Sequence, residues 1–344
     1  MNNREARFLY LSQREVIECG ALDMAMVMDK VEEVLSLRDK GETSMPDKIS
    51  LQWKDCDINS RINAMPGFVG GKCNTGGIKW IGSKPENPSK HGLPRASALT
   101  ILNDPETALP ICIMDGTLIS AMRTGAVTGV GARYLARKDS SSVALIGAGT
   151  QNHTQLKAVL TALPDIKEVR ICDLSSERVD EFIRYEEREN PGLDFKGTAE
   201  AREAVEGADI IVSATTTVKP IVKAEWVKEG AYISNVGNYE YEYDVVRKSS
   251  KVLADNWQAV IHREHQTAAI MVLNGEIRKQ DLYGELGEVI NGKKQGREND
   301  SEIIFFSPIG MGIEDVIVAK EIYDRAEAEG AGTRLTLWDE PFWV

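Results

Sequence analysis

The second part of the chain repeats one unit, a short apolar strand followed by a helical stretch, and this repeat constrains the fold more than any other feature. The strands are "SVALIGAG", "EVRICDL", "DIIVSATT", "AYISNVG", "KVLADN" and "EIIFFSPIG". Several of them are apolar at consecutive positions rather than at alternate ones, which is typical of strands that are covered on both faces. The pattern predicts an α/β fold with a doubly wound parallel sheet, the Rossmann arrangement.

The first 120 residues have a different pattern, with strands, few helices and no strand–helix repeat. Ser12 and Glu15 form a capping box after the strand "RFLYL", and "DMAMVMDKVEEVLSLRDKG" reads as a helix that Gly41 ends. The stretch "NDPET" supplies a turn between two apolar runs and predicts a hairpin. These elements predict an α+β domain.

Two domains are expected, because 344 residues exceed one ordinary core. A long helix rich in small residues, "TLISAMRTGAVTGVGARYLARKD", marks the change of pattern, and something must pack closely against it. The helix "IEDVIVAKEIYDRAEAEG" is expected to return to the first domain. We therefore predict a first domain of residues 1–125 plus 314–344 and an inserted Rossmann domain of residues 126–313.

Charge and cysteine usage exclude several classes of protein. The net charge of −12 argues against a surface for nucleic acid or anionic membrane. The N-terminus lacks the apolar core of a signal peptide, and no apolar run approaches the ~20 residues of a membrane span. "HREH" has helical spacing but matches no zinc motif, so no metal is predicted. Five scattered cysteines without a C-x-x-C pair suit a reducing cytoplasm: Cys19, Cys56, Cys73, Cys112 and Cys172.

The glycine turn "GAGTQN" is the first candidate site. Gly147 permits a tight turn, and Gly149 lets a pyrophosphate approach the N-terminus of the helix that follows. Asp173 ends the next strand, where a carboxylate accepts ribose hydroxyls and favours NAD over NADP. A plain strand–turn–helix corner is the alternative, because the third position of the motif is Asn152 rather than glycine or alanine. Later strand ends that should line the same crevice contain Thr215, Asn235, Val236 and Ile309.

Three basic residues stand in apolar surroundings and are candidates for binding carboxylates. Arg61 interrupts a strand, Lys79 lies between Ile78 and Trp80, and Arg123 lies on the small-residue helix. A cation flanked by apolar residues needs a partner or an anionic ligand, although each alone could be a surface or ion-paired residue. Arg95, Lys48, Lys84 and His91 are weaker candidates. Glu314 and Asp315 are most simply interpreted as acids that favour the start of the last helix.

The chain resembles the ornithine cyclodeaminase/μ-crystallin family in "GIKWIG", "LNDPET", "LISAMRTGAV", "ALIGAGTQ", "GELGEVINGK" and "PIGMGIEDV". This resemblance implies a homodimer built through the first domain and an NAD(H)-dependent step at a carbon that bears an amine. It also implies that Lys48, Lys79 and Arg123 hold the substrate carboxylate. Cofactor contacts implied by the resemblance are Thr150, Gln151, Asp173 and Thr215.

One departure from the family makes cyclodeamination doubtful. Where ornithine cyclodeaminases need an aspartate, "NVGNYEYEYD" offers Tyr239 with Glu240 beside it. "RINAMP", "GIKWIGSKPENPSK" and "RASALTILNDPET" resemble instead the branch that cleaves an N-linked pair of amino acids into 2-oxoglutarate and L-2,3-diaminopropionate, a precursor of siderophores and peptide antibiotics. Lys79 is the expected acid–base residue. Another enzyme of the family, such as an ornithine cyclodeaminase or a ketimine reductase, and a non-catalytic crystallin-like NAD(P)H-binding protein stay open as alternatives.

Overall fold

A computed structural model describes residues 5–54 and 60–343, and the chain divides into two compact units. The first unit comprises Met1–Arg123 and Met311–Val344, and the inserted unit comprises Thr124–Gly310. The chain passes into the inserted unit within helix α4 (Thr117–Leu135) and returns between Gly310 and Met311. The sequence patterns predicted these crossings at 125/126 and 313/314.

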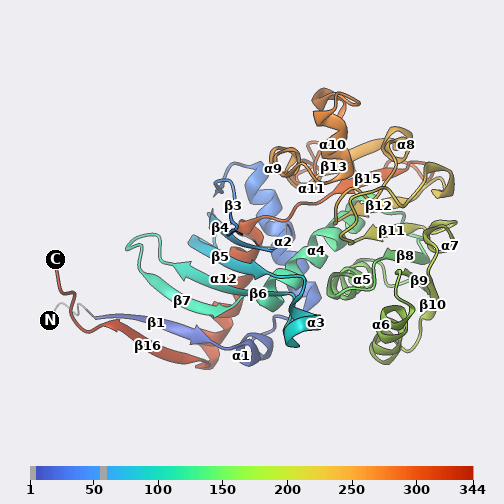
Figure 1. The fold of residues 1–344 in the computed structure, drawn as a ribbon. Coiled ribbons are helices and arrows are strands. Elements are labelled where there is room, and N and C mark those ends of the chain that lie inside the picture. The colour runs from blue at the N-terminus through green and yellow to red at the C-terminus, as the bar shows by residue number, and fades with distance from the viewer. Residues whose placement is uncertain (1–4, 55–59, 344) are drawn as a thin grey trace. The chain divides into compact units, whose positions relative to one another are not determined.

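The first unit contains a mixed, mostly antiparallel sheet in the order β16-β1-β7-β6-β5-β4-β2, with β3 paired to β4. In Figure 1 the last strand, β16, runs beside the first strand, β1. The strands are β1 (Ala6–Leu11), β2 (Thr43–Ser44), β3 (Ile49–Leu51), β4 (Arg61–Val69), β5 (Thr75–Ser83), β6 (Ala96–Asn103), β7 (Pro110–Asp115) and β16 (Thr333–Trp338). The helices are α1 (Gln13–Glu18), α2 (Met24–Asp39), α3 (Asn87–His91) and α12 (Gly312–Glu329).

The two faces of this sheet differ in how they are covered. Helix α12 packs against β4, β5 and β6, and also against α2. Side chains on the face toward α12, such as Leu102 and Met114, are completely buried. On the opposite face the register places apolar side chains in a row, and Trp80 and Leu99, which pair with each other, are 44% and 47% exposed. We call this second surface the open sheet face.

The inserted unit contains a parallel sheet in the order β10-β9-β8-β11-β12-β15-β13-β14. Its strands are β8 (Ser142–Ile146), β9 (Glu168–Cys172), β10 (Asp194–Thr198), β11 (Ile210–Ser213), β12 (Tyr232–Asn235), β13 (Lys251–Ala254), β14 (Gly284–Glu285) and β15 (Ile304–Ser307). Every residue of β8, β11, β12, β13 and β15 is buried, so both faces of the sheet are covered. This confirms the predicted doubly wound sheet.

Short helices connect these strands and cover the sheet. They are α5 (Thr150–Ala162), α6 (Ser176–Glu189), α7 (Ala201–Val205), α8 (Tyr243–Lys248), α9 (Trp257–Arg263), α10 (Thr267–Leu273) and α11 (Leu286–Ile290), with 3-10 turns at Ala224–Trp226 and Lys279–Asp281. Close packing explains the small residues of α4. A Cβ on Gly131 would meet the Tyr232 hydroxyl at 2.3 Å, and one on Gly125 would meet the carbonyl oxygen of Thr154 at 2.3 Å.

Several predicted elements are confirmed, and others are wrong or were missed. The capping box of Ser12 and Glu15, the hairpin of β6 and β7, and the last helix in the first unit are present. Strand β10 was missed because its residues are polar and mostly exposed, which is characteristic of an edge strand. The helical conformation predicted for all four residues of "HREH" is wrong, because α9 ends at Arg263 and Glu264 takes a left-handed conformation (φ 61°).

Three of the four described cysteines are buried, and all four are free thiols, whereas Cys56 lies outside the described residues. Within residues 5–54 and 60–343, no helix has the length and apolar character needed to cross a bilayer. The same part of the chain holds no group of three or more His, Cys, Asp or Glu side chains arranged for a metal ion.

Candidate functional site

Two cations and two carboxylates form a buried cluster in the first unit. The Lys79 ammonium donates to Asp315 Oδ2 at 2.7 Å and to Ser120 Oγ at 3.0 Å. Arg123 donates from Nε to Asp315 Oδ1 at 3.3 Å and from Nη1 to Glu314 Oε2 at 3.1 Å. Lys79, Glu314 and Asp315 are at most 1% exposed, so the charges of this buried ion cluster are compensated within the protein rather than by water.

Close packing of α12 on β4 brings the carboxylates to the cations. A Cβ on Gly67 would meet Ile313 Cγ2 at 2.7 Å, and a Cβ on Gly312 would meet the Met65 carbonyl oxygen at 2.6 Å. The glycines therefore let the first turn of α12 lie directly on the sheet. Lys79 pairs with Met65 across β4 and β5, so the same turn presents Asp315 to the Lys79 ammonium.

The buried ion cluster changes the pKa values of Lys79 and Arg123. Burial, followed by the positive charge of Arg123, lowers the pKa of Lys79 to about 8, although Asp315 opposes the change. Burial alone would also lower the pKa of Arg123, but the charges of Asp315 and Glu314 outweigh it and raise that pKa. Lys79 is therefore close to the range in which an amine exchanges protons near neutral pH, while Arg123 stays charged.

The other predicted cations lie outside this cluster. Arg61 begins β4 and pairs with Ser83, which pairs in turn with Ala96, the first residue of β6. Arg95 immediately precedes Ala96, so both arginines lie at the same end of the sheet. Arg95 is exposed as a residue, yet partial burial and then the charge of Arg61 lower its pKa. Lys48 is exposed and immediately precedes β3.

The predicted cofactor residues lie together at the carboxyl ends of neighbouring strands in the inserted unit. Gly147, Gly149, Thr150 and Gln151 follow β8, and Asp173 follows β9. Thr215 follows β11, Asn235 and Val236 end and follow β12, and Ile309 follows β15. Ligands bind at this edge of open α/β sheets, where the strand order reverses, and here the reversal falls between β8 and β11.

The glycine turn has the geometry that a dinucleotide requires. Gly147 has φ +102°, and a Cβ there would contact the carbonyl oxygen of Ala214 at 3.0 Å. Gly149 is the N-cap of α5, has no side-chain cap, and has open space where a Cβ would stand. The Asp173 carboxylate accepts from the Ala148 amide at 2.8 Å. An uncapped helix N-terminus beside open space, with an acidic residue at the next strand end, fits the pyrophosphate and ribose of NAD.

Asn152, which occupies the third position of the glycine motif, has a structural explanation. Its side chain is completely buried, and its amide nitrogen donates to the carbonyl oxygens of Ile146 and Gly147. A glycine or alanine would leave these two strand-end carbonyls without that donor. The departure from the usual motif therefore stabilises the turn.

Three buried carboxylates in or near the proposed sites were missed or misinterpreted by sequence reasoning. Asp315 and Glu314 were interpreted as acids at a helix start, and this is incomplete: Glu314 does accept from the Met311 amide at 3.0 Å, but both compensate buried cations. Asp255 accepts from the amides of Ile309 and Gly310 at 2.8–3.0 Å and so fixes the turn after β15. A cation among apolar residues, such as Lys79 or Arg123, indicates that an acid is buried close to it. The sequence does not show which acid this is.

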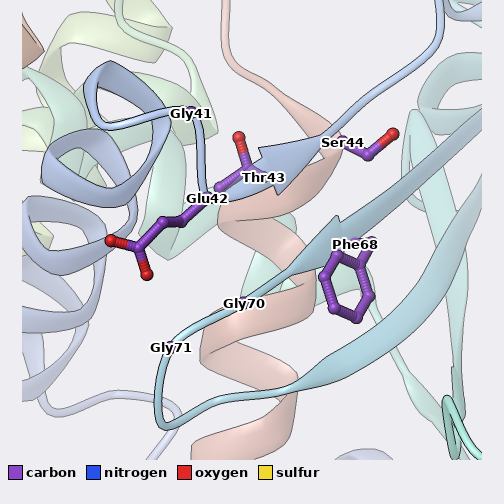
Figure 2. Close-up of a pocket in the computed structure, with 7 residues that line it drawn as sticks. All are labelled: Gly41, Glu42, Thr43, Ser44, Phe68, Gly70 and Gly71. Atoms are coloured by element: carbon purple, nitrogen blue, oxygen red, sulfur yellow. The ribbon is translucent and has the colours of Figure 1, made fainter.

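A hollow of about 410 Å³ lies elsewhere in the first unit, between β2 and the end of β4. Figure 2 shows the Phe68 ring on one side of it and the Glu42 carboxylate pointing away from that ring. The hollow is lined by Gly41, Glu42, Thr43, Ser44, Phe68, Gly70 and Gly71. It contains none of the predicted site residues and no cation, so we do not assign the substrate to it.

Comparison with known proteins identifies the family. The model of the ornithine cyclodeaminase/mu-crystallin family matches residues 9–330. The chain belongs to this family. Its curated relatives in the family include N-((2S)-2-amino-2-carboxyethyl)-L-glutamate dehydrogenase of Staphylococcus aureus, which is 37% identical over 98% of this chain and 100% of its own length.

Two solved structures of the family are also similar over nearly the whole chain. One is the Δ1-pyrroline-2-carboxylate reductase of Thermococcus litoralis in complex with NADH and L-proline, which has 35% identity and a TM-score of 0.88 and covers 95% of this chain and 99% of its own. The other is an archaeal alanine dehydrogenase dimer with bound NAD, which has 36% identity and a TM-score of 0.87 and covers 97% and 100%. These family members are named for reactions of different amino acids.

The buried ion cluster generates a prediction about stability. Asp315→Asn removes the carboxylate that both Lys79 and Arg123 contact, and it leaves two buried cations with Glu314 alone. We expect the free energy of unfolding, measured by urea titration, to fall by about 3–5 kcal/mol. Asp324→Asn is the matched control, because Asp324 pairs with Lys320 on the exposed side of the same helix. Equal stabilities of the two variants would contradict the role of Asp315.

Proposed function

We propose that the chain is an NAD-dependent dehydrogenase that cleaves N-(2-amino-2-carboxyethyl)-L-glutamate to 2-oxoglutarate and L-2,3-diaminopropionate. The carbon–nitrogen bond on the glutamate side breaks, one water is consumed, one NAD⁺ is reduced and one proton is released. Support comes from the relative of that name, which is similar over the full chain, and from the strand-end cluster that fits NAD. The observation that carries the proposal is that Lys79 and Arg123 are paired with buried acids, whereas no ion pair joins Arg61 or Arg95 to an acid among the described residues.

The charges of the first unit favour a substrate with several carboxylates. Lys79 and Arg123 are already paired with Asp315 and Glu314, so the buried ion cluster has no net charge and offers a substrate hydrogen-bond donors rather than excess positive charge. Arg61 and Arg95 are different, because no ion pair joins either of them to an acid among the described residues. Two neighbouring arginines without acids repel each other and favour an anion that bridges them. We propose that they bind the carboxylates of the glutamate moiety.

Lys79 and Arg123 have separate roles in this proposal. Arg123 stays protonated and hydrogen-bonds a substrate carboxylate, with Lys48 as a further contact nearer the surface. Lys79 exchanges a proton, because its lowered pKa allows a neutral amine near pH 8. Water must add to a carbon–nitrogen double bond before the adduct can separate, and the neutral amine can accept the proton which that water loses. Ser120 and Asp315 orient the amine through their hydrogen bonds.

The cofactor is assigned to the carboxyl ends of β8, β9, β11, β12 and β15. Bound NAD⁺ would supply the hydride acceptor for the carbon that bears the amine. Gly147, Gly149, Thr150 and Gln151 would receive the pyrophosphate at the N-terminus of α5. Asp173 would accept from the ribose hydroxyls, which disfavours a 2′-phosphate and hence NADP. Thr215, Asn235, Val236 and Ile309 complete the proposed binding residues.

We also propose that the open sheet face joins two copies of the chain. Tyr10, Ile49 and Leu51 lie on this face with Trp80 and Leu99, and all five are exposed. A sheet that is apolar on both faces is stable in water only when both faces are covered, and α12 covers one. The archaeal alanine dehydrogenase is described as a dimer, which supports a second copy as the partner.

Product identification tests the proposed reaction. The purified chain is incubated with NAD⁺ and, separately, with the N-linked adduct, L-alanine, L-ornithine and L-proline, and the products are identified by mass spectrometry. We expect equimolar 2-oxoglutarate and diaminopropionate from the adduct. Pyruvate from alanine, proline from ornithine, or a pyrroline carboxylate from proline, without cleavage of the adduct, would assign the chain to another activity. Tight NADH binding without any turnover would favour the non-catalytic alternative.

The role of Lys79 predicts both a mutational effect and a pH profile. Lys79→Met should abolish turnover and leave NADH binding within about twofold of the wild type, since Lys79 belongs to the proposed substrate machinery. Only the neutral amine accepts a proton, so kcat/KM for cleavage should rise with pH to about 8 and then level off. Retained turnover in the variant, or a flat profile across this range, would rule out the acid–base role.

The dimer proposal is tested by disrupting the open sheet face. Leu99→Glu places a charge in the centre of the face, and light scattering after size exclusion should show a fall from twice 38.0 kDa to 38.0 kDa. Leu273→Glu is the control, because Leu273 is equally exposed (49%) but belongs to the inserted unit. A wild-type chain that is monomeric at micromolar concentration would exclude this interface.

A further inference from the structure

Glu240 is a buried carboxylate that the proposed reaction does not yet use. It lies five residues after the end of β12 and is completely inaccessible to solvent. Oε1 accepts from the Thr215 amide at 2.6 Å and from the Thr215 hydroxyl at 2.7 Å. Oε2 accepts from Asn235 Nδ2 at 2.7 Å and from the Ser213 hydroxyl. One side chain thus joins the carboxyl ends of two adjacent strands, β11 and β12.

The backbone around Glu240 leaves space for its carboxylate. A Cβ on Gly237 would lie 2.3 Å from Glu240 Oε1, so only glycine leaves the necessary space. The Glu240 carbonyl oxygen accepts from the amides of Ile221 and Val222 at 2.8 and 3.0 Å, which fixes the residue from its main chain as well. Both the side chain and the backbone of Glu240 are therefore held in one position.

The charge of Glu240 needs an explanation, because no salt bridge joins it to a cation among the described residues. Burial raises the pKa of Glu240, and the donors from Ser213, Thr215 and Asn235 oppose that change. Burying a carboxylate without a cation costs several kcal/mol, and four hydrogen bonds offset part of this cost. A core that needed only packing would use a neutral side chain here. The acceptors instead order Thr215 and Asn235, two of the residues proposed to line the cofactor site.

Sheet topology indicates which part of a dinucleotide these strand ends would serve. The strand order reverses between β8 and β11, and a dinucleotide straddles such a reversal. Asp173, the proposed ribose-binding residue, follows β9 on one side of the reversal. On the other side of the reversal, Thr215 follows β11 and Asn235 ends β12, so these two residues lie where the nicotinamide half would bind.

We propose that Glu240 is a positioning residue that holds the ends of β11 and β12 in the conformation which receives the nicotinamide half of NAD. This inference rests on the proposed binding of NAD. The hydrogen-bonding groups of the Asn235 side chain are already occupied within the protein. Its Nδ2 donates to Glu240 and to the Asn238 carbonyl oxygen, and its Oδ1 accepts from the Thr267 amide. The Thr215 hydroxyl donates to Glu240 and accepts from the Thr217 amide at 3.3 Å, which leaves one lone pair as an acceptor for a ligand.

Glu240→Gln tests the proposal without changing the size of the side chain. An amide nitrogen in place of one oxygen opposes a donor, either Asn235 Nδ2 or the Thr215 amide, so at least one strand end is released. Dissociation constants are measured by fluorescence or calorimetry for two probes, NADH and ADP-ribose, which lacks the nicotinamide. We expect the constant for NADH to rise at least tenfold and the constant for ADP-ribose to change less than threefold.

Asp244→Asn is the matched control, because Asp244 is an exposed acid four residues further along that pairs with Arg247. It should leave both constants unchanged. NADH binding by Glu240→Gln within twofold of the wild type would overturn the inference, and so would an equal loss of both probes, which indicates general unfolding of the site. If the variant does not fold, Ser213→Ala removes a single donor to Glu240 and must show the same selective loss. A wild-type chain that binds neither probe would refute the proposed function itself.

Discussion

The buried pair of Lys79 and Asp315 is the contact on which the first unit depends. Neither charge could lie in the interior alone, and the pair joins strand β5 to helix α12, which are 236 positions apart in the sequence. Arg123 and Glu314 extend the pair and connect it to α4. Burial and the charge of Arg123 lower the pKa of Lys79, whereas the two carboxylates keep Arg123 charged.

The inserted unit uses buried carboxylates in a different way. The oxygens of Glu240 and Asp255 accept hydrogen bonds from strand ends and turns. A parallel sheet fixes its strands by their ladders, but the ladders stop where the strands end. Acceptors placed just beyond the ends order the loops that the sheet itself cannot hold. Both units thus rely on interior carboxylates, in one to neutralise cations and in the other to orient backbone and amide donors.

Much of the fold could be predicted from local patterns, whereas the contacts of the site could not. Consecutive apolar residues predicted β8, β11 and β15, and small residues predicted the close packing of α4. Strand β10 was missed since a polar edge strand has no apolar pattern to detect. Lys79 and Arg123 were recognised as unusual because apolar neighbours surround them. Their partners Glu314 and Asp315 were interpreted as helix-start charges, since sequence spacing contains no information about a contact across two hundred positions.

The glycine turn and Glu240 illustrate the same limit at shorter range. A turn between a strand and a helix is a local feature, so Gly147 and Gly149 could be assigned from spacing alone. The position of Glu240 depends on four donor groups of Ser213, Thr215 and Asn235, which come together only in the sheet. Tyr239 and Glu240 stand out in the sequence because the family pattern changes there, yet only the fold distinguishes the buried carboxylate from the half-buried ring beside it.

The interruption of the first unit by the inserted one has a consequence for biosynthesis. A ribosome releases Lys79 and Arg123 long before Asp315, so the nascent first segment carries interior cations whose counter-ions do not yet exist. The inserted unit is contiguous and can fold as soon as it emerges, because none of its strands waits for a later partner outside it. The first unit must stay open until α12 and β16 arrive, and β16 then pairs with β1, which is more than 300 residues earlier in the chain. The charged centre of the first unit is therefore completed only after the whole inserted unit has been synthesised.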